Sequence, residues 1–367
     1  MLSPLYKLSP SNGKVQVWEI TTDSEFYTVT QGQVGGKLQT YRTECFGKNI
    51  GKVNETTVAQ QCSLEAEALI SKKLKTGYTL DTSGEQSVFT PMKIGVYSKC
   101  KSKLDFKTGV YLSRKLNGLN GEYRLINDEL ILLSRGGETF PRIPHLEQSV
   151  RAMMLRLDTA SLNGELYAQG TSLQQIVSLV KKPKPGSEQL EFHVFDCPNL
   201  SGGYLERATV LHCSDLMLAP VFAIPFERVA SHEEIQTKCD AFVAQGYEGV
   251  VVRTASSLYE YNTRSLTTMK LKPVLDKEFL VLSFKRDKLC HAIYLCASDG
   301  GNFSVKRKGT AEARLADAAI AETNIGKYLT VEFESYSDAR PGFTQGKPTK
   351  PVGLDFRKCS TDGEPLD

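Results

Sequence analysis

The sequence has few of the residues that build metal centres, disulfide frameworks or membrane spans. Its 367 residues include 5 histidines and 9 cysteines, and no two cysteines form a C-x-x-C pair. Neither a zinc ribbon nor a disulfide framework is indicated. The most apolar window, 216–226, is broken by two prolines, and the first 14 residues lack the apolar stretch of a signal peptide. We therefore expect a cytoplasmic protein with reduced thiols and no contact with a membrane.

Net charge is also small. The chain carries 45 basic and 42 acidic residues, a formal charge of +3, which excludes a uniformly basic, histone-like protein but allows a local basic channel. Hydrophobic residues make up 40% of the chain, with 16 phenylalanines and 15 tyrosines, so global disorder is excluded. At roughly 150 residues per domain, the length predicts two or three domains.

The first 80 residues have the pattern of a small β-rich unit that ends in one helix. Apolar and polar residues alternate over three predicted strands: 14–20, 25–30 and 38–43. The helix is predicted over 55–74, with Thr56 or Thr57 as its N-cap. The polar stretch 81–86 is a predicted linker.

Strands and helices alternate from about residue 91 to 273. The predicted strands are 161–169, 191–196 and 249–253. The predicted helices are 146–157, 172–181 with Thr171 as its cap, and one from Ser231 to Gly246 that opens with a capping box. The last ~90 residues return to β structure with one helix over 311–323, a pattern that predicts a small barrel beside a larger α+β domain.

One lysine stands in a sequence that could carry chemistry. Lys115 lies in the string R-K-L-N-G, 114–118, where the glycine lets backbone approach a phosphate or a base closely. Alone, this string favours a hairpin turn that carries a solvated lysine.

An ordered set of short motifs follows Lys115 along the chain. They are S-R-G-G at 134–137, N-G-E-L-Y at 163–167, F-H-V-F-D at 192–196, E-G-V-V-V-R at 248–253 and M-K-L-K-P at 269–273. Lys270 and Lys272 are two residues apart, so both point to one face of a strand. Each motif is weak by itself, and their order makes the signal specific.

This series resembles the covalent nucleotidyltransferase superfamily, and in particular the small ATP-dependent DNA ligases of the bacteriophage and bacterial type. The resemblance covers residues 91–358, because 303–310, 325–332 and 346–357 are similar to the oligonucleotide-binding (OB) domain of those ligases. It implies ATP as AMP donor, Mg²⁺ as metal cofactor and nicked double-stranded DNA as partner of a monomeric enzyme.

The resemblance also implies roles for individual residues. Lys115 is the nucleophile that carries AMP; neighbouring cations such as Arg114 would favour its neutral form. The further implied residues are Lys270 and Lys272 on the α-phosphate, Glu165 on the ribose or a metal, Glu248 on Mg²⁺, Phe195 stacked on adenine, Arg135 on the nick 5′-phosphate and Arg357 on pyrophosphate. Phe192 is expected in the core.

Three asparagines depart from the family pattern. Asn117 and Asn163 replace aspartates, and Asn120 stands where an arginine is usual. These changes leave open a catalytically weak protein that binds DNA breaks. An RNA ligase or capping-type nucleotidyltransferase, which shares the lysine chemistry, is the other alternative.

Basic residues cluster in two segments, 98–115 and 277–308. We expect Arg114, Lys306, Arg307 and Lys308 to contact a DNA backbone. The N-terminal unit resembles a WGR domain through 27–37 and the helix that ends near Tyr78, although Gln31-Gly32-Gln33 replaces the signature triplet. The predicted organisation is α+β: a WGR-like DNA-binding domain (1–83), an adenylation domain with antiparallel sheets and flanking helices (84–274) and an OB-fold barrel (275–367).

Overall fold

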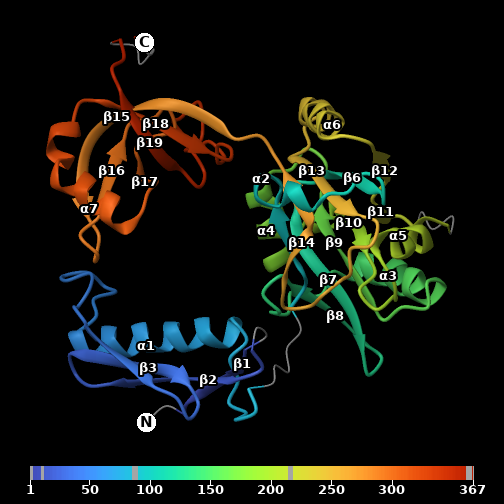
Figure 1. The fold of residues 1–367 in the computed structure, drawn as a ribbon, viewed down its shortest axis with the longest axis horizontal. Helices are drawn as coiled ribbons and strands as arrows, with labels where there is room; N and C mark the ends of the chain where they lie inside the picture. The colour runs from blue at the N-terminus through green and yellow to red at the C-terminus, as the bar shows by residue number, and fades with distance from the viewer. Residues whose placement is uncertain (1–2, 10–11, 85–89, 214–217, 361–365, 367) are drawn as a thin grey trace.

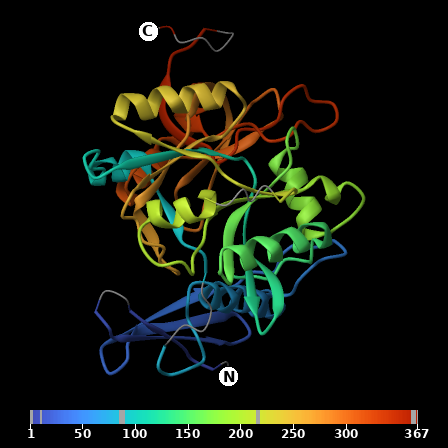
Figure 2. The same cartoon turned by 90° about the vertical axis from the view of Figure 1, so that its right-hand side faces the viewer.

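The computed structural model describes residues 3–9, 12–84, 90–213, 218–360 and 366. Figure 1 shows three bodies in chain order, and in the turned view of Figure 2 the first lies below the other two. Within the described residues, no helix is long and apolar enough to cross a membrane.

The first body is a four-stranded antiparallel sheet covered on one face by a helix. The strands run in the order β1-β2-β3-β4, with bounds Leu5–Leu8, Val15–Thr22, Phe26–Gln33 and Leu38–Glu44. Helix α1, Val58–Lys75, begins at Thr57, whose side chain accepts from the Gln60 backbone N–H in a capping box. Trp18 and Ile20 bury their side chains against the helix at Ala66. All three predicted strands and the helix are confirmed, and β1 was not predicted.

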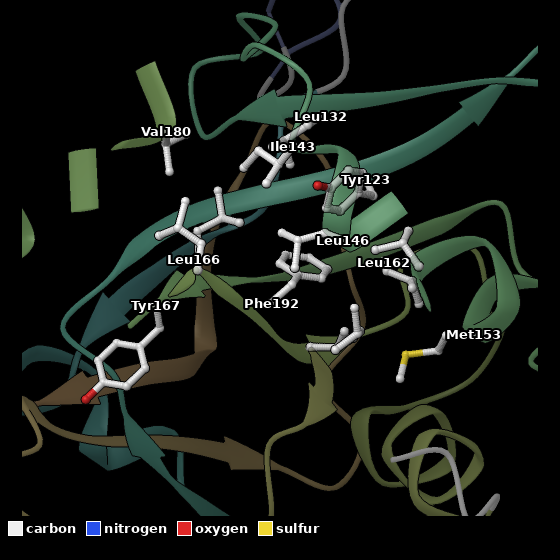
Figure 3. Packing of buried hydrophobic residues seen from close by; sticks show 14 of the residues in the cluster. Tyr123, Leu132, Ile143, Leu146, Met153, Leu162, Leu166, Tyr167, Val180 and Phe192 are labelled. Atoms are coloured by element: carbon white, nitrogen blue, oxygen red, sulfur yellow. The ribbon is translucent and has the colours of Figure 1, made fainter. Parts of the chain in front are cut away.

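The second body contains two five-stranded sheets. The first has the order β11-β10-β9-β7-β8. Its strands are β7 (Leu119–Ile126), β8 (Glu129–Ser134), β9 (Ser161–Tyr167), β10 (Glu191–Asp196) and β11 (Val221–Ala223), and its helices are α3 (Pro144–Arg156), α4 (Leu173–Lys181) and α5 (Tyr204–Cys213). Figure 3 shows the core between this sheet and its helices, with Phe192 near Leu146. The Phe192 ring is fully buried and lies edge-on to Tyr123, as predicted for a core residue.

The second sheet has the order β12-β6-β13-β14-β5. Its strands are β5 (Lys93–Val96), β6 (Val110–Lys115), β12 (Phe226–Val229), β13 (Gly249–Thr254) and β14 (Arg264–Leu271), with helices α2 (Tyr97–Cys100) and α6 (His232–Ala244). Ser231 caps α6 as predicted, because its hydroxyl accepts from the Glu234 backbone N–H. The predicted capping box is not complete, since the Glu234 carboxylate accepts from the Ala230 backbone N–H at 2.7 Å and not from that of Ser231. The apolar residues of β13 are buried on both sides, between β6 and β14.

The third body is a closed five-stranded barrel with the order β15-β16-β17-β19-β18. Its strands are β15 (Leu275–Arg286), β16 (Ala292–Cys296), β17 (Phe303–Arg307), β18 (Tyr328–Phe333) and β19 (Val352–Arg357). The predicted barrel is therefore present, filled by residues such as Phe279, Tyr294 and Val331.

Two predicted helix boundaries are wrong. Helix α4 is capped by Ser172 and not by Thr171, because the Ser172 hydroxyl accepts from the Gln175 backbone N–H. The helix predicted over 311–323 ends earlier: α7 spans Ala311–Ala319, and a separate 3-10 turn spans Ala321–Asn324. Parts of the predicted linker and of the apolar window 216–226 lie outside the described residues.

Candidate active site

A cleft between the two sheets of the second body gathers most of the predicted site residues. It has a deep end lined by Phe195 and Arg253 and a basic end lined by Lys270 and Lys272. Lys115 lines both ends, because β6 stops at this residue and turns toward the first sheet. The K-x-N-G string is thus a strand-to-loop turn, as predicted.

Lys115 forms an ion pair with a carboxylate from the neighbouring strand. Its ammonium group donates to Glu248, which directly precedes β13, and the backbone N–H of Glu248 donates to the Lys115 carbonyl at 2.9 Å. The other oxygen of Glu248 lies 3.1 Å from Lys272 Nζ. Burial opposes ionisation of Glu248, yet Lys115 and Lys272 hold the pKa of this carboxyl below its ordinary value. One carboxylate therefore orients two lysines.

Lys270 lies beside this cluster on β14 and lines the basic end of the cleft. Burial, reinforced by the positive charge of Lys272, lowers the pKa of the Lys270 ammonium group. The period-2 spacing brings both lysines to one face, as predicted.

Glu165 projects from β9 into the same cleft. Burial raises the pKa of Glu165 to about 7, although the charges of Lys115 and Arg135 oppose this shift. Gly118 fits closely against this strand: a Cβ there would lie 2.4 Å from the Leu166 carbonyl oxygen and 2.7 Å from Glu165 Cγ. The glycine of K-x-N-G is therefore required by the approach of the turn to β9.

The deep end has an aromatic wall and a buried cation. Phe195 on β10 lines it, and the Arg253 guanidinium lies 5.8 Å from the Phe195 ring and 4.7 Å from Tyr204. Arg253 also donates to the Ser113 hydroxyl at 3.0 Å. Arg253 was not among the predicted site residues. Val251 and Arg253, two residues apart on β13, both line the cleft, so strand alternation is the signal that could have identified it.

A buried ion pair fixes the strand end beside Phe195. Asp196 accepts from Arg207 through both carboxylate oxygens, at 2.7 and 3.0 Å, and both side chains are almost fully buried. Arg207 also donates to the carbonyl of Ser257. This bidentate pair holds β10 against the chain that follows β13.

The barrel reaches into the basic end. Glu334, directly after β18, lies 2.5 Å from Lys272 Nζ and 2.5 Å from Lys350 Nζ. Burial opposes its ionisation, but Lys272 and Lys350 lower the pKa of Glu334 to about 2. A second contact of the segment after β18 is a hydrogen bond, in which the Ser172 hydroxyl at the start of α4 donates to the Asp338 carboxylate at 2.7 Å. Lys350 lines the cleft, whereas the predicted pyrophosphate residue Arg357 is exposed on β19 and does not line it.

Further basic side chains surround the opening of the cleft. Arg135 lies at the junction of its two ends, and Lys93, Lys181 and Arg264 line the basic end. Arg135 was predicted, whereas the other three could not be, because β5, α4 and β14 are far apart in the chain and meet only in the fold.

The other predicted DNA contacts have partners inside the protein. Arg114 donates to the Tyr247 hydroxyl at 3.0 Å. Lys306 pairs with Asp287 at 2.6 Å, Arg307 with Asp317 and Asp355, and Lys308 with Glu332 at 3.7 Å. Their role on DNA stays a prediction.

Among the described residues, no group of three or more histidine, cysteine, aspartate or glutamate side chains could hold a metal ion by itself. Two carboxylates, Glu165 and Glu248, nevertheless line the basic end together. Such a donor set fits Mg²⁺, which proteins hold through one or two carboxylates plus substrate phosphates.

Comparison with known proteins agrees with this geometry. Residues 91–272 match the family model of the ATP dependent DNA ligase domain. A DNA ligase of African swine fever virus is 28% identical over 339 residues, which cover 85% of this chain and 79% of the viral protein.

Solved structures share the fold. A Lig E DNA ligase superposes with a TM-score of 0.59 at 17% identity, covering 73% of this chain and 99% of that chain. The Pmar-Lig_Pre structure superposes with a TM-score of 0.65 at 16% identity, covering 82% of this chain and 73% of that one. The matched domain and the viral relative therefore place residues 91–272 of this chain in the ATP-dependent DNA ligase family.

Proposed function

We propose that the protein seals nicks with a 5′-phosphate and a 3′-hydroxyl in duplex DNA, through a lysyl-AMP intermediate. The observation that carries the proposal is the position of Lys115. It lies at the junction between a deep aromatic end, which fits a base, and an end lined by Lys270 and Lys272, which fits phosphates.

In the first step, the neutral Lys115 amine attacks the α-phosphorus of ATP. The N–P bond forms, the bond from the α-phosphorus to the bridging oxygen breaks, and pyrophosphate leaves with the electron pair. Before the attack, the ion pair with Glu248 must separate and the Lys115 ammonium group must lose one proton to solvent. The amine then loses a second proton to solvent as the N–P bond forms. Lys270 and Lys272 are placed to neutralise the charge that develops on the phosphoryl oxygens.

In the second step the nick 5′-phosphate attacks the lysyl-AMP phosphorus and releases the lysine amine. In the third step the 3′-hydroxyl oxygen attacks the 5′-phosphorus, and AMP leaves. Arg135 at the opening of the cleft would hold the 5′-phosphate. Each step moves negative charge at phosphorus, so the same lysines serve all three.

Glu165 and Glu248 would hold the Mg²⁺ ion. The bound ion would supply charge neutralisation at the phosphate oxygens. Phe195 would stack on the adenine ring, and Lys350, placed over the basic end by the barrel, would face the leaving pyrophosphate in the position expected of Arg357.

The domain organisation supports this function. We assign residues 1–83, 84–274 and 275–367 to three domains. The closed five-stranded barrel, with the order β15-β16-β17-β19-β18, supports our assignment of an OB fold, in which exposed basic residues would follow a phosphate backbone. No membrane contact is needed, and we place the protein in the cytoplasm as a monomer.

The N-terminal domain is a candidate for holding duplex DNA near the nick. Its WGR-like assignment rests on the sheet, on α1 and on Lys73, which lies over the rings of Trp18 and Tyr78. Removal of residues 1–83 should lower the affinity for nicked duplex several-fold. An unchanged affinity in a folded truncation would reduce the domain to a structural extension.

The test of the function is a sealing reaction. Protein, ATP and Mg²⁺ are incubated with a labelled nicked duplex, with a duplex whose nick is flanked by RNA, and with GTP in place of ATP. Sealing of the DNA nick with ATP supports the proposal. Preference for RNA or for GTP would favour the RNA ligase or capping alternatives, and binding without sealing would favour a DNA-break binding protein.

A further inference from the structure

Asparagine stands directly before glycine at four places in the sequence, and three of these asparagines line the cleft. The four dipeptides are Asn12-Gly13, Asn117-Gly118, Asn120-Gly121 and Asn163-Gly164. Asparagine before glycine is especially prone to deamidation, because glycine has no Cβ to hinder attack of its backbone nitrogen on the asparagine side chain. The surroundings of each dipeptide in the fold decide whether this reaction proceeds.

Asn117 has the surroundings that the reaction needs. It lies in the bend between β6 and β7, the residue is exposed, and its side-chain amide forms no hydrogen bond with the described residues. The backbone N–H of Gly118 donates to the Glu165 carboxylate, so the attacking nitrogen faces the cleft and not a neighbouring strand. Neither residue of this dipeptide is part of a β ladder.

The two other asparagines of the cleft are held in place. Asn163 lies on β9, between β7 and β10, and both atoms of its amide are hydrogen-bonded, one to the Gly121 carbonyl and one to the Tyr259 hydroxyl. Asn120 lies on β7, between β8 and β9, and its Nδ2 donates to the Gly164 carbonyl at 3.3 Å. A central strand must open before its backbone can close a ring onto the side chain, and such opening costs much of the free energy of unfolding.

Asn12 is an exposed reference away from the cleft. It lies in the turn between β1 and β2, where its Oδ1 accepts from the Lys14 N–H at 3.1 Å and the Gly13 N–H donates to the Ser9 carbonyl at 2.9 Å. This dipeptide reports the rate of an exposed Asn-Gly turn in the same molecule.

We propose that Asn117 is a site of spontaneous deamidation, which replaces an amide two residues from Lys115 with a carboxylate. The Gly118 nitrogen bonds to Asn117 Cγ, the bond from Cγ to the side-chain nitrogen breaks, and the Gly118 amide proton leaves with that nitrogen as ammonia. Water then opens the resulting succinimide ring to give aspartate or isoaspartate. In sum, one water is consumed and one ammonia is released, with no oxidant or reductant.

The modification changes the charge at the basic end of the cleft. Asn117 lines this end together with Lys270, Lys272 and Lys350. A new carboxylate there opposes the phosphates of a nucleotide, so we expect the affinity for ATP to fall by about threefold in the modified protein. This consequence rests on the proposed use of ATP, whereas the modification itself requires only the folded chain.

The experiment incubates the full chain and its Asn117→Gln variant in mildly alkaline buffer, without nucleotide, metal or DNA. Digestion under acidic conditions and peptide mass spectrometry then follow the conversion of amide to acid at each dipeptide, with Asn117→Asp as the product standard. We expect Asn117 to convert within about threefold of the rate of Asn12, and at least about tenfold faster than Asn120 and Asn163. Asn117→Gln should keep its amide, because glutamine must close a larger ring, while Asn12 converts as in the wild type.

Conversion of Asn117 that is no faster than conversion of Asn163 would overturn the inference. Calorimetry with ATP in EDTA tests the consequence: the affinity should fall with incubation in the wild type and stay constant in Asn117→Gln, and equal losses in both would overturn it. Conversion is measured without ATP, which separates the inference from the proposed function. Conversion at Asn117 in a chain that never forms lysyl-AMP would contradict the function alone, whereas lysyl-AMP formation by a chain that keeps this amide would contradict the inference alone.

Discussion

Glu334 of the barrel lies 2.5 Å from Nζ of Lys272, the lysine that we place on the α-phosphate. The contact joins the barrel to the chain directly after β14, and it presents a carboxylate where a phosphate oxygen is expected. Because Lys272 also pairs with Glu248 and thereby with Lys115, the barrel is connected to the nucleophile through three ion pairs. A nucleotide must compete with Glu334 for Lys272.

Substitution of Glu334→Gln should therefore tighten ATP binding. The variant keeps the shape of the side chain but removes the competing charge, and we expect a gain of about 3–10-fold in affinity. Calorimetric titration with ATP in EDTA measures this. Glu332→Gln is the control, since Glu332 pairs with Lys308 on the barrel and does not line the cleft. Weaker binding in Glu334→Gln alone would contradict the competition.

Glu165 should make stability depend on pH. Its pKa is raised to about 7 in the folded protein from an ordinary 4.5, so the folded state binds the proton more tightly. The free energy of unfolding therefore falls as pH rises from 4.5 through 7. Glu165→Gln removes the buried charge, so its melting temperature should exceed that of the wild type by about 2–4 °C at pH 8 and match it at pH 5. The exposed Glu129→Gln serves as control, and an equal difference at both pH values would refute the assignment.

Arg307 should matter more for barrel stability than for DNA. It pairs with the buried Asp317 at 3.0 Å and with Asp355 at 2.7 Å. Arg307→Ala leaves the Asp317 carboxylate buried without its cation, at a cost of about 2–3 kcal/mol. Lys308→Ala, whose partner lies at 3.7 Å in an exposed pair, should cost less than about 0.5 kcal/mol. Chemical denaturation compares the two; equal stabilities would contradict the ion-pair account.

Lys93 and Lys181 should bind the phosphate backbone near the nick. Both line the basic end of the cleft. Each substitution to alanine should weaken binding of nicked duplex and reduce the slope of log K against log salt by about 1. Fluorescence anisotropy at several salt concentrations gives this slope. Lys238→Ala is the control, because Lys238 pairs with Glu227 at 2.8 Å away from the cleft; an effect as large as that of Lys93→Ala would argue against a local DNA path.

Much of the fold could be predicted from local pattern. Alternation located β2 and β3, a capping hydroxyl located the start of α1, and glycine marked the turn after Lys115. These signals are short-range, since they depend on residues within one or two turns of each other. The strand order of the two sheets, which places β6 between β12 and β13, depends on contacts distant in the sequence and could not be predicted in this way.

The site shows the same division. Lys115, Glu165 and Glu248 stand in motifs, and the fold brings them together as expected. Lys93 and Lys350 stand in no motif, and only the meeting of β5 and the barrel at the cleft reveals them. Arg253 ends the E-G-V-V-V-R motif, but its place beside Phe195 depends on the fold. Clusters of basic residues in the sequence did not locate exposed, unpaired charge. The basic residues at 306–308 are paired with carboxylates that lie close to them only in the folded barrel.

The central claim is that Lys115 becomes covalently bonded to AMP. The direct measurement incubates the protein with α-labelled ATP and Mg²⁺ and maps the label by peptide mass spectrometry. We predict one labelled site, at Lys115, lost in Lys115→Ala and retained in the control Lys93→Ala. Label on another residue, label that survives Lys115→Ala, or no label on a folded wild-type protein would contradict the account.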